Sequence, residues 1–576
     1  MNQKLENILN VSLDATEDEL RKADSLSTGY NWRDNTWEII VKYSGSLESI
    51  RNRYNVYIKE LLNYYAIIVA DKAKIELISQ EDVIDYVEKP KSLYYQIERT
   101  KTAACVGSVR ADGNILSGKG VIVGVIDTGI DIFDNAFRNS DGTTRILNIY
   151  DQTTGEKYDK QSIDEYIRLN EDLSGGTFSY DNAPGVDNIM HGTDVSYIAA
   201  GSLGVAYEAD IIAVKMGYSI NNQFPRTTSL MDAIDYIIRK AIEYRKPVAV
   251  NISYGCNYGA HNGNTLLESF IDDISKSYRC VICVGSGNEA DKAIHFGGII
   301  NTGQVQTAYL SVGEYQSAID IQIWKNYWDT IDVMLINPRG EQIGIITEGR
   351  INRYETYNTE IITLLGEPSP YNIYQEIYIN LIPKTDYILS GIWQIVLMAG
   401  SIRAGEYNIW LPSSQALGYA TAFNNPTADG TITIPATARN CIAVGAYNAY
   451  TNSYAAFSGR GFDNSIRNVN AGVKPDITAP GVDISIARQR GNDITYRNVT
   501  GTSYAVPVVT GAAALLMQWG IVMGNDRFMY GEKLKAALID GSKPVGLVGI
   551  TRNDNQPDPR TGWGAVCLKN TLNKIL

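Results

Sequence analysis

The stretch "GKGVIVGVIDTGID", residues 118–131, decides the fold class of this chain. Its run 121–126 is apolar throughout, ends in Asp127, and is followed by a Thr-Gly turn signal. An apolar strand without polar alternation is buried on both faces, which is typical of parallel sheets covered by helices. Similar runs alternate with helical stretches at 209–217, 246–255, 280–288 and 441–448. The pattern predicts a doubly wound α/β domain with its chemistry at the carboxyl ends of the strands.

Two regions differ from this domain in their pattern of apolar and polar residues. Residues 1–96 alternate short strands and helices, which predicts a small α+β module. Residues 296–427 show two-residue alternation, turn signals and many aromatics, which predicts an inserted all-β sandwich. The α/β pattern therefore occupies 97–295 and resumes at 428–576.

The composition narrows the function. The chain has 576 residues, 44% of them hydrophobic and 20% charged, with a formal net charge of −13. The acidic balance disfavours nucleic-acid binding. The first residues lack the pattern of a signal peptide, and we expect no segment long and apolar enough to span a membrane. These features predict a globular protein made in the cytosol, with neither nucleic acid nor membrane as a partner.

The six cysteines include a C-x-x-C pair, Cys280 and Cys283. The pair lies in a Val/Ile-rich run expected to be a buried strand, where residues three apart point to opposite faces. No second C-x-x-C is present to complete a zinc site. We therefore expect two buried structural thiols.

Three side chains of different chemistry stand where strands end or helices begin: Asp127, His191 and Ser503. Nucleophilic acyl transfer needs a hydroxyl, an imidazole that takes its proton, and a carboxylate that orients the imidazole. Each residue alone has an ordinary structural interpretation, since Ser and Asp are common capping residues. Asn288, in the glycine-rich turn "VGSGNEA", is a candidate donor to an oxyanion or a residue that stabilises its own turn.

Several motifs occur in an order that resembles subtilisin-like serine proteases: "VIDTGID", "HGTDVSYIAAG", "NISYG", "GSGNEA", "KPDITAPGVDI" and "GTSYAVPVVTGAAALL". The resemblance covers roughly 110–295 and 428–576 and implies a subtilisin-like parallel sheet. It also implies Asp127 as the residue that orients the base, His191 as the base, Ser503 as the nucleophile and Asn288 in the oxyanion hole. Substrate binding is implied for Ser253, Tyr254, Gly255 and Gly287.

The N-terminal module resembles the propeptide of that family, which acts as intramolecular chaperone and inhibitor. Its tail is then expected in the substrate cleft, with self-cleavage near Gln96-Ile97 and Tyr95 as the alternative residue on the acyl side. A propeptide without a secretion signal and a jelly-roll-like insertion are similar to the clostridial Csp proteases. That resemblance implies spore packaging and, as substrate, the precursor of a cortex-lytic hydrolase in germination.

The chain departs from the family pattern at several places. The segment "AAGSLGVAYEAD", residues 199–210, is too short for the tight calcium site of many subtilisins, so we expect no metal or other cofactor. Tyr504 stands beside the nucleophile where relatives commonly have Met, which predicts a narrowed cleft. Asp194 replaces a common His and is expected to favour the charged form of His191. Residues 151–188 are expected to form a surface loop.

Three functions are compatible with these features. The first is an endopeptidase of limited specificity that activates a precursor protein. The second is a binding or signalling scaffold whose propeptide stays permanently in the cleft. The third is a degradative subtilase whose sandwich binds substrate.

Overall fold

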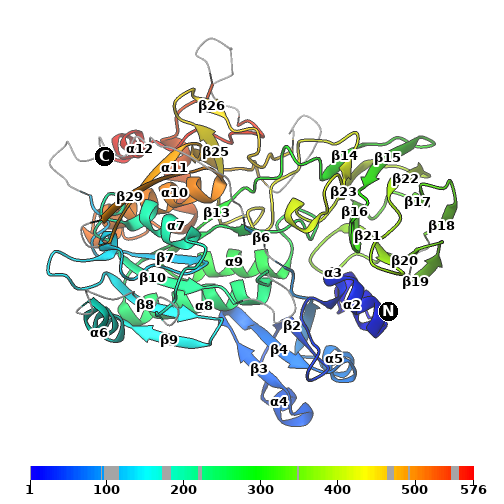
Figure 1. Ribbon diagram of the computed structural model, residues 1–576, viewed down its shortest axis with the longest axis horizontal. Helices are drawn as coiled ribbons and strands as arrows, with labels where there is room; N and C mark the ends of the chain where they lie inside the picture. Colours follow the sequence, from blue (N-terminus) through cyan, green and yellow to red (C-terminus); the bar gives the residue numbers. More distant parts are fainter. Residues whose placement is uncertain are drawn as a thin grey trace.

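The computed structural model of the chain describes residues 2–92, 94–95, 116–171, 183–217, 224–346, 349–462, 472–490, 493–546 and 557–576. Figure 1 shows an α/β body at the left, a β-sandwich at the right, and the N-terminal module below and between them. The three bodies follow the order of the three sequence patterns along the chain. The strands of the sandwich lie between the first and second parts of the α/β body.

The α/β body is built on a nine-stranded sheet in the order β26-β25-β13-β11-β7-β10-β8-β9, with β27 beside β25. Neighbouring strands from β25 to β8 are parallel, and β26 and β9 are antiparallel additions. Every residue of β7 is buried, because helices cover both faces. The bounds are β7 Ile122–Asp127, β8 Ile146–Asp151, β9 Glu156–Asp159, β10 Asp210–Lys215, β11 Val248–Ile252, β13 Cys280–Gly285, β25 Ile442–Asn448, β26 Ser453–Tyr454 and β27 Ile477–Pro480.

Helices α7 and α10 pack on one face of this sheet, and α8 and α9 on the other. A Cβ added at Gly124 of β7 would lie 2.7 Å from Ile237 Cγ2 of α8, so this glycine permits close helix–sheet packing. The predicted doubly wound α/β fold is thereby confirmed. The helix bounds are α6 Lys160–Glu171, α7 His191–Ala200, α8 Thr227–Tyr244, α9 Leu266–Ser277, α10 Thr502–Met517, α11 Gly531–Asp540 and α12 Leu568–Ile575, with a short 3₁₀ helix at Asn135–Phe137 and a π-helical segment at Gln518–Val522 that continues α10.

Helix α10 is apolar on all sides. The stretch Thr502–Val522 has the length and hydropathy of a membrane span, although no such segment was expected. However, 89% of its apolar window is buried inside the protein. A helix that is hydrophobic all round is typical of the centre of a large soluble core as well as of a membrane, and here it lies against the central sheet.

The β-sandwich consists of two antiparallel sheets that share one apolar core. One has the order β14-β23-β16-β21-β20-β19 and the other β18-β17-β22-β15-β24. Burial alternates along strands such as β17, as the two-residue pattern predicts. The bounds are β14 His295–Ile299, β15 Val305–Val312, β16 Ile319–Asn326, β17 Ile331–Ile336, β18 Gln342–Ile345, β19 Ile351–Glu355, β20 Thr359–Leu365, β21 Tyr374–Pro383, β22 Gly391–Ala399, β23 Glu406–Trp410 and β24 Ala422–Phe423, with a turn at Ser414–Ala416.

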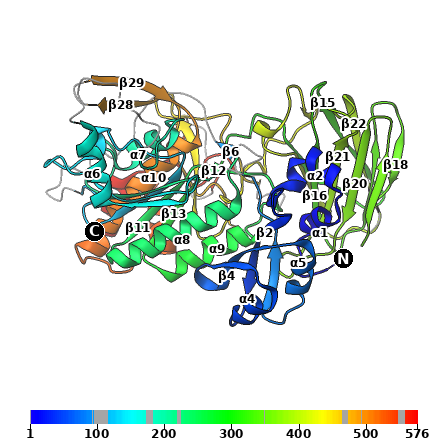
Figure 2. The same cartoon turned by 60° about the horizontal axis from the view of Figure 1, so that its bottom comes forward.

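The N-terminal module has an antiparallel sheet in the order β1-β2-β4-β3, with β5 also paired to β2. Apolar residues of this module join the core of α8 and α9 on one side and the core beside β20 and β21 on the other. Figure 2 shows it seated between the two larger bodies. The bounds are α1 Asn7–Asp14, α2 Glu17–Lys22, α3 Asp24–Ser27, β1 Tyr30–Asn31, β2 Thr36–Tyr43, α4 Glu48–Tyr54, β3 Tyr57–Glu60, β4 Tyr65–Ala70, α5 Lys72–Ser79 and β5 Ile84–Glu88, with a turn at Leu62–Tyr64.

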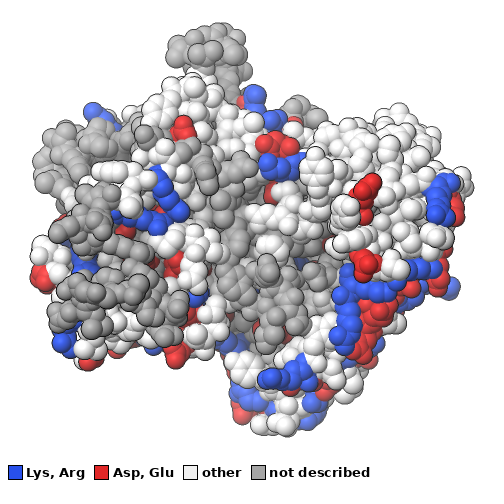
Figure 3. Space-filling view, viewed as in Figure 1, with Lys and Arg blue, Asp and Glu red and all other residues white. Residues whose placement is uncertain are grey.

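Ionic contacts add to the apolar contacts between the module and the sandwich. Arg353 Nη2 of β19 lies 3.0 Å from Asp14 Oδ2, and the same guanidinium also contacts Glu19 of α2. Figure 3 shows side chains of both signs interleaved at the lower right, where α2 and β19 lie. The module is therefore bound to the sandwich by complementary charge as well as by burial.

The expectation of a surface loop over residues 151–188 is wrong for its first half. Residues 156–171 form β9, which pairs with β8, and the amphipathic helix α6. Ile163 and Ile167 are buried, and their spacing of four places both on one helix face. This spacing was present in the sequence, but the many polar neighbours obscured it.

Candidate active site

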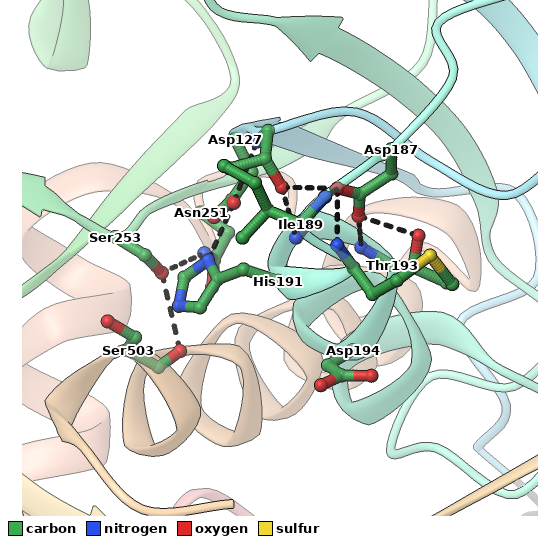
Figure 4. Close-up of polar contacts among 12 residues, drawn as sticks. Asp127, Asp187, Ile189, His191, Thr193, Asp194, Asn251, Ser253 and Ser503 are labelled. Atoms are coloured by element: carbon green, nitrogen blue, oxygen red, sulfur yellow. Dashed lines mark hydrogen bonds and ion pairs between the residues drawn. The ribbon is translucent and has the colours of Figure 1, made fainter. Parts of the chain in front are cut away.

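The carboxyl ends of the parallel strands meet at one edge of the sheet. Asp127 is the last residue of β7, and His191 is the first residue of α7. His191 Nδ1 lies 2.7 Å from Asp127 Oδ1, and both side chains are buried. A carboxylate at Nδ1 fixes the imidazole tautomer and directs Nε2 to the opposite side of the ring. Figure 4 shows Ser503 on that opposite side.

Asp187 organises the start of α7 and was not singled out in the sequence. Its Oδ1 accepts hydrogen bonds from Met190 N and Thr128 Oγ1, both at 2.7 Å, and its Oδ2 accepts from Thr193 N at 2.8 Å. These donors lie on both sides of His191 in the chain. Asp187 therefore holds the backbone that carries the imidazole, in the way a capping carboxylate fixes a helix start.

Ser503 lies in the first turn of α10, directly after the sharp turn at Gly501, whose φ is 149°. Its neighbour across the site is Ser253, whose Oγ accepts from Asn251 Nδ2 at 3.0 Å and donates to the Ser503 carbonyl at 3.3 Å. Both serines are buried in the described structure. These hydrogen bonds hold the carboxyl end of β11 against the start of α10.

Asn288 lies next to this helix start. Its Oδ1 accepts from Thr502 N at 3.0 Å and from Thr502 Oγ1 at 3.1 Å. A backbone N–H can only donate, which assigns the amide oxygen to this side and the amide NH₂ to the other. Nδ2 is buried and has no hydrogen-bond partner in the part of the chain that the structure describes. A donor held in this way is suited to an oxyanion.

Gly287 precedes Asn288 and has a positive φ of 94°. A Cβ at this position would lie 2.5 Å from Thr433 Cγ2, so the close approach of the chain also requires glycine. The structure thus gives this residue a conformational reason to be glycine, and its predicted contact with substrate stays a prediction.

The predicted substrate-binding residues Tyr254 and Gly255 form strand β12, directly after Ser253, which contacts the Ser503 carbonyl. The tail of the N-terminal module, β6 (Tyr94–Tyr95), pairs with it antiparallel, Tyr95 opposite Tyr254. The module therefore contributes a strand to the edge where a peptide substrate is expected. The predicted cleavage residues Gln96 and Ile97 lie outside the described residues.

Tyr504 packs against the imidazole. Its ring centroid lies 5.2 Å from that of His191, and the two planes are inclined by 58°. Burial raises the pKa of the Tyr504 hydroxyl well above its ordinary value, against the opposing influence of Arg497. A neutral aromatic side chain thus fills the space beside the base.

Asp194 does not act on the imidazole as we expected. Its carboxylate is buried and forms ion pairs with Arg488 and Arg497, which lie on the hairpin β28 (Ile484–Arg490) and β29 (Asp493–Val499). Figure 4 shows the side chain of Asp194 directed away from the ring of His191. Two guanidinium groups therefore balance its charge.

The other candidate groups have no part in this site. Cys280 and Cys283 are buried on opposite faces of the central sheet, and burial raises the pKa of each thiol to about 12. Within the described ranges, no group of three or more His, Cys, Asp or Glu side chains is placed to hold a metal ion. The absence of a tight calcium site stays a prediction.

Comparison with protein families gives two matches. A family described as the Subtilase family matches residues 118–368 and 404–564, and one described as the Csp protease B prodomain matches residues 3–91. The first match covers the α/β body and much of the sandwich. The second coincides with the N-terminal module.

Two solved structures are similar to this chain to different degrees. The structure of the Clostridium perfringens CspB protease is 34% identical, with a TM-score of 0.74 over 82% of this chain and 96% of that chain. Fervidolysin from Fervidobacterium pennivorans, described as a keratinolytic enzyme related to subtilisin, is 16% identical with a TM-score of 0.47, over 95% of this chain and 63% of that chain. Only the first similarity is strong enough to inform the site.

Curated proteins match over shorter lengths. The subtilase-type proteinase RRT12 of Saccharomyces cerevisiae is 33% identical over 128 residues, which is 22% of this chain and 23% of that protein. Subtilisin-like protease 10 of Arthroderma otae is 34% identical over 120 residues, 21% of this chain and 27% of that protein. The chain thus spans about a quarter of the length of these curated relatives.

Proposed function

Because the chain belongs to the subtilase family of serine proteases, we propose that it is an endopeptidase whose catalytic residues are Asp127, His191 and Ser503. The observation that carries this proposal is the 2.7 Å contact between Asp127 Oδ1 and His191 Nδ1, with Ser503 on the other side of the imidazole. The three residues come from the end of one strand and the starts of two helices. Their separation in sequence makes a chance arrangement of these three side chains a poor explanation.

The reaction follows from these roles. His191 Nε2 takes the proton of Ser503 Oγ as the oxygen attacks the peptide carbonyl carbon. The carbonyl oxygen becomes an oxyanion, for which Asn288 Nδ2 and the Ser503 N–H are the donors. The C–N bond then breaks, and His191 gives the proton to the leaving amine. Water, deprotonated by the same imidazole, hydrolyses the acyl-enzyme and restores Ser503. Asp127 stays ionised and stabilises the imidazolium. No cofactor enters these steps.

The N-terminal module acts as a propeptide that the enzyme itself cleaves near Gln96-Ile97. The pairing of β6 with β12 supports this, since it brings the chain just before the proposed scissile bond to the edge of the site. The match to the Csp protease B prodomain supports it independently. The large contact of the module with both other bodies predicts that it stays bound after cleavage.

The substrate we propose is an inactive precursor protein cut at one or a few bonds, and more specifically the precursor of a cortex-lytic hydrolase in a germinating spore. The similarity to the Clostridium perfringens CspB protease supports this choice. It also supports packaging of the protein in the spore. The buried aromatic side chain of Tyr504 beside His191 favours restricted over broad cleavage.

The test compares the purified protein with Ser503→Ala. N-terminal sequencing is expected to find Ile97, or a residue close to it, as a new N-terminus in the wild type and the intact chain in the variant. A fluorophosphonate probe is expected to label Ser503 once the module has been displaced. Processing of Ser503→Ala when purified alone, or no labelling of the displaced wild type, would instead favour the scaffold.

The substrate is tested separately. Incubation with the hydrolase precursor is expected to give one discrete cut, while casein stays largely intact. Broad cleavage of casein would favour a degradative subtilase and contradict the proposed specificity.

A further inference from the structure

The carboxylate of Asp194 is held by two arginines that come from another part of the chain. Arg488 Nε donates to Asp194 Oδ1 at 3.1 Å, and Arg497 Nη2 contacts Oδ2. The side chain of Asp194 is fully buried, and that of Arg488 is only 12% exposed. A buried carboxylate is costly without cationic partners, so the three residues form one unit, which we call the arginine clamp.

The arginine clamp also contacts the residue before His191. Arg488 Nη2 donates to the Met190 carbonyl at 2.9 Å, and Arg497 Nη2 donates to the same oxygen at 3.0 Å. Met190 has a left-handed backbone with φ of 67° and directly precedes α7 as its N-cap residue. The two guanidinium groups therefore hold α7 at two points, one residue before His191 and three residues after it.

The hairpin that supplies the arginines leads directly to the nucleophile. Ile486 pairs with Arg497, so these two side chains and that of Arg488 share one face of the β28–β29 hairpin. Ile486 is completely buried, which places this face against the body of the protein. Strand β29 ends at Val499, shortly before Ser503. The clamp thus joins the segment that delivers Ser503 to the helix that delivers His191.

We infer that Asp194, Arg488 and Arg497 are positioning residues, which set the place of His191 relative to Ser503. This inference rests on the proposed function, because it assumes that the two residues react together. None of the three is placed to touch the substrate in the reaction above. Their effect passes through the Met190 carbonyl and the first turn of α7. A displacement of about 1 Å of a reacting group costs on the order of 100-fold in rate.

Two variants test the clamp. Asp194→Asn removes the charge that holds both arginines, and Arg488→Lys keeps a cation while losing the planar contact with two acceptors. Both are expected to lower kcat and the rate of fluorophosphonate labelling of the displaced enzyme by about 10-fold to 100-fold, with KM changed less than twofold.

Asp476 provides a matched control, because it lies at the amino-terminal end of a strand while the candidate site lies at the carboxyl ends of the strands. Asp476, directly before β27, is buried and held by Lys474 and Lys535, each at 2.8 Å. Asp476→Asn breaks a similar unit away from the reacting groups. It is expected to lower the melting temperature without changing kcat at temperatures below unfolding.

The outcomes separate the two proposals. If the displaced wild type is labelled and both clamp variants keep kcat within twofold while their melting temperatures fall, as in the control, the clamp is merely structural and the inference is wrong. If the displaced wild type is not labelled, the proposed function fails, and the inference falls with it. If kcat falls and KM stays unchanged in both clamp variants, while kcat stays unchanged in Asp476→Asn, the positioning role of the clamp is supported.

Discussion

The backbone of Tyr95 pairs with that of Tyr254 as an added antiparallel strand at the edge of the candidate active site. Upstream of this strand, Lys91 exchanges hydrogen bonds with Thr227, through Lys91 N to Thr227 Oγ1 at 2.7 Å and Thr227 N to Lys91 O at 2.6 Å. The tail of the module is thus held first at the start of α8, through Lys91, and then at β12, through Tyr94–Tyr95. Any substrate that uses the same strand must displace it, so the strength of the module's attachment governs activity.

An ion pair at the edge of the module offers a way to alter this attachment. Glu38 Oε1 of β2 lies 3.0 Å from Arg226 Nη1, which directly precedes α8. We expect Glu38→Arg to weaken attachment through repulsion and to raise turnover of a short peptide about threefold to tenfold. The double variant Glu38→Arg with Arg226→Glu is expected to restore the wild-type rate. Equal turnover in the single and double variants would show that this pair does not govern release.

The fixed orientation of Asn288 predicts a graded loss of activity. Asn288→Ala removes the amide donor and is expected to lower kcat by about 10²-fold to 10³-fold with little change in KM. Thr502→Val removes only the hydroxyl that donates to Asn288 Oδ1 at 3.1 Å, while the backbone N–H still holds the amide. A smaller loss, about tenfold or less, is expected for it. Steady-state kinetics on processed enzyme measure both, and a normal kcat in Asn288→Ala would exclude the proposed oxyanion role.

The sequence predicted the α/β body well, because its strands carry their own signature. Runs such as 121–126 are apolar without alternation, and that pattern has few interpretations other than a strand buried on both faces. The position of Asp127 at the end of such a run indicated its place at the carboxyl edge of the sheet. The pairing between this residue and His191 depends on strand order, which local sequence does not specify.

The contacts that support the site were harder to predict for the same reason. Asp187 lies in a polar segment whose sequence suggests only a turn, and its role depends on the fold bringing Thr128 to it. Arg488 and Arg497 lie about 300 residues from Asp194 in the chain. Asp194 was therefore expected to act on its sequence neighbour, His191, while its actual partners come from a distant hairpin.

The ring of Tyr504 predicts a packing role that does not need its hydroxyl. Tyr504→Ala is expected to leave a cavity beside His191, to lower stability by about 3–5 kcal/mol, and to lower kcat about tenfold. Tyr504→Phe keeps the ring and is expected to stay within twofold of the wild type. Thermal unfolding and kcat of the processed enzymes check this. A large loss in Tyr504→Phe would instead assign a catalytic role to the hydroxyl.

The contact between the module and the sandwich is expected to weaken as the pH rises. Glu376 of β21 is buried, and burial, together with the charge of Glu6, raises its pKa from 4.5 to about 7. Because the folded-state pKa is above the unfolded one, this group contributes stability that is fully present below about pH 4.5. The contribution is lost as the pH rises through about 7. Ionisation of buried Glu376 then costs on the order of 3 kcal/mol.

Replacement of Glu376 by Gln tests this directly, since the amide has the same shape and does not ionise. We expect Glu376→Gln to raise the melting temperature by several degrees at pH 8 and to leave it nearly unchanged at pH 5. Glu360→Gln, on the neighbouring strand β20, serves as the control and is expected to show no such difference between the two pH values. Because Glu376 faces the N-terminal module, the wild type should also release the cleaved module faster at pH 8 than at pH 5. Equal effects of Glu376→Gln at both pH values would show that this carboxyl group does not titrate in the window.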